Sequence, residues 1–178
     1  YFTVHTHANQ HAGYFPGATP IHILVHVGAD GRILGAQAVG ADGVDRRIDV
    51  IATAMRAGLS ATDLIDLDLA YAPPYGQAKD PVNQTGMVAH NVLTGELVLT
   101  GPEALTEDTP VLDVRTVGEY AAGHMPNSLN IPHTQLRDRL DEVQAWVDET
   151  VGDQPFVVMC AAGVRSWIGY RIVRHAGF

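Results

Sequence analysis

The 178 residues of the chain, 46% of them hydrophobic, allow either one large domain or two small ones. A formal net charge of −9 argues against nucleic acid or an anionic membrane as a partner, and no apolar stretch approaches the roughly 20 residues of a membrane span. One cysteine and no signal-peptide pattern favour a reducing compartment, so we expect a cytoplasmic protein.

Residues 1–97 predict an antiparallel sheet with helices. Residues 1–7 alternate between apolar and polar side chains, as a half-buried strand does. Residues 20–27 and 32–39 are also strand-like, and the Asp30-Gly31 pair between them is a strong hairpin signal.

Helical patterns follow these strands. After the third strand the apolar spacing changes to that of a helix, which Gly58 ends. Its expected buried face comprises Val44, Ile48, Ile51, Ala52 and Met55, and its expected outer face comprises Arg46, Arg47 and Asp49. Ser60 with Asp63 predicts the cap of a second, short helix. Pro81 suits the first turn of a third helix, which we expect to run to about Leu93.

A turn-rich stretch, residues 95–102, precedes a different pattern, and we place the domain boundary between residues 97 and 98. Strands expected at residues 111–114, 129–131 and 156–159 alternate with helices from 117, over 135–147 and from 165. Such alternation is typical of an α/β domain with a parallel sheet and helices on both faces. Ligands of these sheets bind at the carboxyl ends of strands, where the only cysteine, Cys160, lies.

Cys160 opens a short loop suited to binding an anion. The loop consists of the small residues Ala161, Ala162, Gly163 and Val164, and Arg165 and Ser166 then begin a helix. Backbone N–H groups of such a loop point inward, and the positive end of the helix dipole lies beneath them. We therefore expect a lowered pKa for Cys160, and a bidentate hydrogen bond from the Arg165 guanidinium to a bound anion. The alternative is an inert, buried thiol at a strand end.

Two stretches carry a family resemblance. Residues 160–166 resemble the active loop of single-domain rhodaneses, and residues 111–132, with their D-V-R, G-H-x-P and N-I-P patterns, resemble the other hallmark of that family. The resemblance implies that residues 98–178 are a C-terminally incomplete rhodanese-like sulfurtransferase domain, in which Cys160 carries sulfane sulfur as a persulfide. It places Ala161, Ala162, Gly163, Val164 and Ser166 at the substrate site, and lets Arg165 bind an anionic donor such as thiosulfate. Four residues separate Cys160 from Arg165, fewer than in the similar cysteine phosphatases, which favours sulfur over phosphate chemistry.

Asp113 and Arg115 lie at an expected strand end next to this loop. We predict that they form an ion pair that braces the loop. The alternative is a plain surface pair of little energetic consequence.

Residues 1–97 carry a second resemblance. Residues 11–20, 32–55 and 69–83 are similar to the dimerisation domain of flavin-dependent pyridine nucleotide–disulfide oxidoreductases, in particular to the coenzyme A disulfide reductase and NADH oxidase branch. The resemblance implies an N-terminally incomplete dimerisation domain, a homodimer through residues 1–97, and a place for Tyr14 and Tyr71 at the partner subunit's active site. A phenol there could donate a proton to a leaving thiolate; the alternative is that both tyrosines only pack at the interface.

Some members of that branch carry a C-terminal rhodanese domain in the order seen here. We therefore expect the C-terminal fragment of an FAD-dependent NAD(P)H reductase for CoA disulfide, CoA persulfide or polysulfide, with a rhodanese domain that supplies sulfur to it. The chain has no GxGxxG motif, so FAD and NAD(P)H are expected in the full-length protein and not on this fragment alone. The alternative is a non-catalytic dimerisation and sulfur-carrier or regulatory module.

A histidine-rich segment, residues 5–11, resembles the zinc motif of metallo-β-lactamase-fold enzymes. Asn9 stands where that motif has aspartate, and His11 comes one position late. We therefore predict no metal site.

Overall fold

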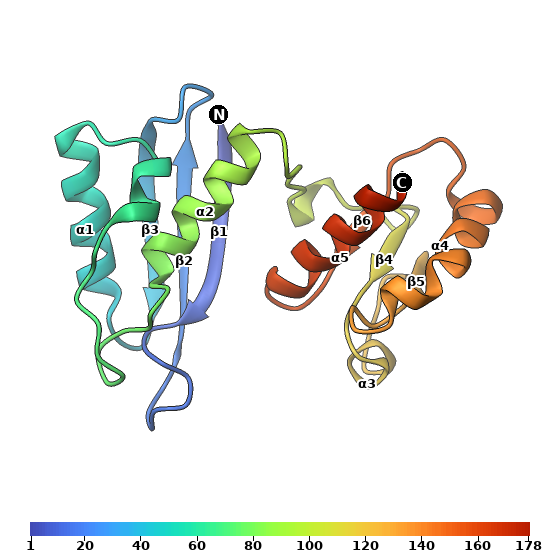
Figure 1. Cartoon of the computed structure of the whole chain (residues 1–178), viewed down its shortest axis with the longest axis horizontal. Coiled ribbons are helices and arrows are strands. Elements are labelled where there is room, and N and C mark those ends of the chain that lie inside the picture. The colour runs from blue at the N-terminus through green and yellow to red at the C-terminus, as the bar shows by residue number, and fades with distance from the viewer. The chain divides into compact units, whose positions relative to one another are not determined.

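The computed structural model describes all residues from Tyr1 to Phe178 and divides them into two compact units, Tyr1–Leu99 and Thr100–Phe178 (Figure 1). Each unit has its own hydrophobic core. None of the helices combines the length and apolar character that crossing a membrane requires.

The first unit is an antiparallel sheet with helices, as predicted (Figure 1). Its elements are the strands β1 (Phe2–Asn9), β2 (Pro20–Val27) and β3 (Ile33–Gly40), and the helices α1 (Val44–Ala57), η1 (Thr62–Asp66) and α2 (Pro81–Leu93). The strands pair in the order β1-β2-β3, and the hairpin turn at Gly31 joins the second to the third. One face of the sheet packs against the helices through a core that includes Val4, Ile23, Val25, Ile51, Leu64 and Val82.

The caps of this unit follow the local sequence signals. Gly58 ends α1 in the left-handed conformation, with φ of 77°. The backbone N–H of Ser60 donates to the Asp63 carboxylate at 2.7 Å, so the two residues interact as predicted, although the N-cap residue of η1 is Ala61. Asp80 caps α2 by accepting from the backbone N–H of Val82 at 3.0 Å.

The predicted faces of α1 were wrong at two positions. Arg47, expected on the outer face, is only 1% exposed, and Ala52, expected in the core, is exposed. The buried stripe of the helix runs through Arg47, Ile51 and Ala54, which share one face at helical spacing. Burial of Arg47 is possible because its guanidinium meets the carboxylate of Asp80 with an N–O distance of 2.8 Å.

The second unit has the predicted parallel sheet with helices (Figure 1). Its elements are η2 (Pro102–Ala104), β4 (Val111–Asp113), α3 (Val117–Ala121), β5 (Ser128–Asn130), η3 (Leu136–Arg139), α4 (Leu140–Trp146), η4 (Val147–Val151), β6 (Val157–Met159) and α5 (Val164–Ala176). The strand order is β5-β4-β6, so the middle strand is the first in sequence. Leu112 lies in register with Leu129 on one side and with Val158 on the other.

Helix α5 packs closely on this sheet at a glycine. A Cβ atom added to Gly169 would lie 3.0 Å from Cγ1 of Val114 and 3.1 Å from Cγ1 of Val158. Ile172 and Val173 of the same helix belong to the core of the unit. Because the helix lies this close to the strands, its first residues and the loop before it are held at the carboxyl end of β6.

Candidate functional site

The Cys160 loop lies between the end of β6 and the start of α5, as its sequence predicts. The backbone N–H of Gly163 donates to Sγ of Cys160 at 3.1 Å. Gly163 has φ of 99°, a conformation that favours glycine, and it immediately precedes the helix. The Ser166 hydroxyl donates to the Gly163 carbonyl at 2.8 Å and so closes the turn. The loop therefore curls around the sulfur.

The electrostatics of this loop favour a thiolate. Burial raises the pKa of the half-buried Cys160 thiol. Hydrogen bonds from the Ser166 side chain, and from the backbone N–H groups of Ala162, Ser166 and Gly163, outweigh burial, so that the pKa is lowered overall. A lowered pKa makes the nucleophilic form of the cysteine more abundant at neutral pH.

Arg165 makes an ion pair that the sequence analysis missed. Its two terminal nitrogens donate to the two carboxylate oxygens of Glu119, each at 2.7 Å. Glu119 also accepts from the backbone N–H of Thr116 at 2.9 Å and from its hydroxyl at 2.7 Å, at the start of α3. The Arg165 fork and the Thr116 bonds together hold the pKa of the Glu119 carboxyl far below its ordinary value. An anionic sulfur donor would therefore compete with Glu119 for this guanidinium.

The pattern Thr116-x-x-Glu119 could have revealed half of this arrangement. It is a capping-box sequence, and the structure has both of its reciprocal bonds. The contact with Arg165 spans 46 positions, so no local pattern reports it.

Asp113 and Arg115 form the expected ion pair, with the shortest N–O distance at 2.6 Å. Asp113 is fully buried and accepts both from the Arg115 guanidinium and from its backbone N–H at 3.0 Å, so the alternative of a plain surface pair does not hold. Arg115 also donates to the carbonyl of Gly123 at 2.8 Å. That the pair braces the Cys160 loop stays a prediction.

Tyr14 and Tyr71, both in the first unit, lie together. Their hydroxyl oxygens are 3.1 Å apart, and the two side chains are 77% and 49% exposed. The hydrogen bond with Tyr14 raises the pKa of the Tyr71 phenol. A pair of exposed, hydrogen-bonded phenols is suited to proton donation.

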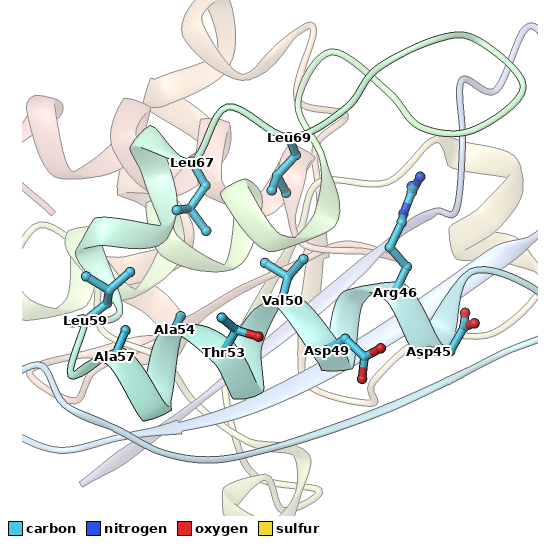
Figure 2. Close-up of a pocket in the computed structure, with 10 residues that line it drawn as sticks. All are labelled: Asp45, Arg46, Asp49, Val50, Thr53, Ala54, Ala57, Leu59, Leu67 and Leu69. Atoms are coloured by element: carbon cyan, nitrogen blue, oxygen red, sulfur yellow. The ribbon is translucent and has the colours of Figure 1, made fainter.

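An apolar groove of about 490 Å³ lies elsewhere on the first unit, along α1 (Figure 2). Val50 points from the helix toward Leu67 and Leu69, and Asp45 and Arg46 lie at one end (Figure 2). None of the residues predicted for a site lines this groove.

The histidines of residues 5–11 do not gather into a ligand set. His7 lies against His22 of the neighbouring strand, with ring centroids 4.8 Å apart. No three His, Cys, Asp or Glu side chains form a group that could hold a metal ion.

Two family models match the chain. Residues 1–81 match the pyridine nucleotide-disulphide oxidoreductase dimerisation domain, and residues 102–178 match the rhodanese-like domain. Among curated relatives, coenzyme A disulfide reductase of Staphylococcus haemolyticus is 43% identical over 93 residues, which are 52% of this chain and 21% of the relative. Its counterpart from Staphylococcus aureus is 43% identical over 90 residues, 50% of this chain and 20% of the relative.

Solved structures extend the similarity over both units. The crystal structure of reduced Bacillus anthracis CoADR-RHD has a TM-score of 0.90 at 41% identity, and an NAD-dependent persulfide reductase from A. fulgidus has a TM-score of 0.86 at 40% identity. Each alignment covers 99% of this chain and 31% of the solved chain, so the present sequence spans under a third of those proteins. Residues 1–81 are therefore a pyridine nucleotide-disulphide oxidoreductase dimerisation domain and residues 102–178 a rhodanese-like domain, and the similarity to the two solved structures extends over both.

Proposed function

We propose that this chain is the C-terminal part of an FAD-dependent NAD(P)H reductase for CoA disulfide, CoA-linked persulfide or polysulfide. Its rhodanese-like domain transfers sulfane sulfur through a persulfide on Cys160. The observation that carries the sulfur-transfer role is the Cys160 loop, where N–H donors face a sulfur of lowered pKa. The reductase role is supported by the similarity to a coenzyme A disulfide reductase and to a persulfide reductase.

The sulfur step needs only Cys160 and a donor. The Cys160 thiolate attacks the outer sulfur of thiosulfate, the S–S bond of the donor breaks, and sulfite leaves with the electron pair. An acceptor thiolate then attacks the terminal sulfur of the persulfide. The S–S bond of the persulfide breaks, and Cys160 is again a thiolate. The N–H of Gly163 stabilises the negative sulfur before and after transfer.

The other loop residues hold this geometry. Ser166 closes the turn at Gly163 and favours the thiolate. Arg165 ties the start of α5 to α3 through Glu119, and it reaches an oxyanion donor only by exchanging that carboxylate. Ala161, Ala162 and Val164 follow Cys160 in the loop and are exposed, so a donor meets them as it approaches the sulfur.

FAD and NAD(P)H belong to parts of the full-length protein outside residues 1–178. A nucleotide pyrophosphate needs a glycine-rich turn between a strand and a helix, and the glycines of this chain do not form that pattern.

Residues 1–97 form a homodimer in this proposal, and Tyr14 and Tyr71 serve the active site of the partner subunit. There one phenol donates a proton to a thiolate that leaves a disulfide or persulfide. The exposure of both phenols and their mutual hydrogen bond support that role. Sedimentation at micromolar concentration tests the assembly, and a monomer would count against it. The lone cysteine suits a cytoplasmic location.

Incubation with thiosulfate, followed by intact-mass measurement, tests the sulfur-transfer role. We expect the chain to gain one sulfur atom, and dithiothreitol to remove it. Cys160→Ser should gain none, because the chain has no other thiol. Sulfur addition to Cys160→Ser, or none to the native chain, would overturn the proposal. A persulfide that forms but never passes to an added thiol would favour the sulfur-carrier alternative.

A further inference from the structure

We propose that Arg47 is a positioning residue for the Tyr14–Tyr71 pair, because it joins the bases of the two loops that present these phenols. The inference rests on the proposed role of the two tyrosines in the partner's active site. Arg47 itself is 1% exposed and touches no reacting atom.

Arg47 makes four hydrogen bonds from inside the first unit. Its guanidinium donates to the two carboxylate oxygens of Asp80 at 3.3 and 2.8 Å, to the carbonyl of Gln10 at 2.5 Å and to the carbonyl of Gly43 at 3.1 Å. Gln10 and Asp80 are themselves 3% and 5% exposed. One buried cation therefore binds both Gln10 and Asp80, which lie far apart in the sequence.

Gln10 closes the base of the loop that carries Tyr14. Its backbone N–H donates to the Thr19 carbonyl at 3.0 Å, and its side-chain oxygen accepts from the Thr19 N–H at 2.6 Å. Its side-chain nitrogen donates to the Gly17 carbonyl at 3.2 Å. Holding Gln10 therefore holds both ends of residues 10–19.

Asp80 closes the loop that carries Tyr71, because it caps α2 directly after residues 71–79. The two loops also bond to each other. The backbone N–H of Ala12 donates to the Gly76 carbonyl at 2.8 Å, and the Gln77 side chain donates to the Asn9 carbonyl at 2.7 Å.

The phenols cannot hold themselves in place. A single hydrogen bond between exposed groups is worth little in water, and long exposed side chains lose conformational entropy when they are fixed. The 3.1 Å contact of Tyr14 with Tyr71 therefore depends on the loops beneath, which are joined through Arg47 as well as by their direct bonds to each other. The guanidinium of Arg47 donates four hydrogen bonds in a fixed plane, one more than the three N–H groups of an ammonium can supply.

Kinetics of the full-length protein test the inference with Arg47→Lys and Asp80→Asn. We expect either variant to lower kcat by roughly ten- to a hundredfold with little change in KM, since misplacement of a catalytic group by about 1 Å can cost that much. Thr85→Val is the control, because it removes two buried hydrogen bonds of the first unit, with Thr6 at 2.8 Å and to the Pro81 carbonyl at 2.9 Å, while residues 10–19 and 71–79 keep all of theirs. It should lower the melting temperature and leave kcat unchanged.

A double-mutant comparison separates positioning from general damage. In a Tyr14→Phe background, Arg47→Lys should cause a much smaller further loss of kcat than it causes alone. An equal further loss in that background would overturn the inference, because Arg47 would then act independently of the phenols.

A second measurement does not depend on activity. With 3-fluorotyrosine incorporated, ¹⁹F NMR titration follows the Tyr71 phenol, whose pKa is raised by Tyr14. We expect Arg47→Lys, but not Thr85→Val, to remove that shift; an unaltered shift in Arg47→Lys would refute the inference. If Tyr14→Phe costs no activity while Arg47→Lys still removes the shift, the proposed function of the phenols fails and the positioning role of Arg47 stands.

Discussion

Gly169→Ala should destabilise the rhodanese-like unit, although alanine is the better helix former. Gly169 lies within α5, where that helix meets the sheet. The new methyl would lie 3.0 Å from Val114 and 3.1 Å from Val158, closer than carbon atoms normally approach. Both neighbours are β-branched and stiff, so the helix has to move away from the strands.

Two opposing effects set the size of the change. Replacing an interior glycine of a helix by alanine gains about 1 kcal/mol, whereas overpacking a core costs about 1–3 kcal/mol. We expect a net destabilisation of about 1 kcal/mol for Gly169→Ala. Gly118→Ala in α3 is the matched control, because a Cβ there meets nothing within 4 Å. That variant should gain up to about 0.5–1 kcal/mol.

Urea unfolding followed by tryptophan fluorescence reports on the rhodanese-like unit alone. Trp146 and Trp167 are the only tryptophans of the chain, and both lie in that unit. With a slope of about 1 kcal/mol/M, the midpoint should fall by about 1 M in Gly169→Ala and rise by less than that in Gly118→Ala. A Gly169→Ala protein as stable as Gly118→Ala would show that the helix and the strands are not in tight contact.

Three further outcomes follow from the Cys160 loop. Ser166→Ala should raise the pKa of the Cys160 thiol, and the pH midpoint of iodoacetamide alkylation should move upward; an unchanged midpoint would show that the single hydroxyl proton stays on the Gly163 carbonyl. The pKa of Glu119 lies below its ordinary 4.5 in the folded chain, so its contribution to stability is complete above pH 4.5 and is lost as the pH falls below it. Glu119→Gln should therefore weaken the acid dependence of urea unfolding, and an identical dependence would contradict the ion pair. Arg165→Lys should slow transfer from every sulfur donor by a similar factor, because lysine cannot hold both oxygens of Glu119. A rise in KM confined to oxyanion donors would instead show that the guanidinium leaves Glu119 to bind them.

Local signals in the sequence predicted most of the fold. The bounds of α2, Pro81–Leu93, follow from the proline at its first turn and from the helical spacing after it. The hairpin between β2 and β3 follows from the Asp30-Gly31 pair, which is typical of tight hairpin turns. The Cys160 loop was also predictable, because a strand, small residues and a helix start stand next to each other in the chain.

Contacts between distant residues were not predictable in the same way. The charge of Arg47 predicted a place on the outer face, whereas Arg47 lies inside because Asp80, 33 positions later, neutralises it. The bond expected from Arg165 to a bound anion was inferred from its own loop, whereas Glu119, its partner in this structure, comes from another helix. Family resemblance implied a place for Tyr14 and Tyr71 at one active site but not their hydrogen bond, because no periodicity or spacing connects positions 57 apart.

The shared base of the two tyrosine loops has a consequence for their evolution. A guanidinium has a fixed shape, so an insertion beside Gln10 or Asp80 would carry one of its acceptors out of reach. An insertion at an exposed tip, such as beside Tyr14, leaves Gln10 and Asp80 within reach of the guanidinium. Lineages of this domain should therefore vary the tips of the loops freely, and change the lengths of their bases only together or when Arg47 is lost.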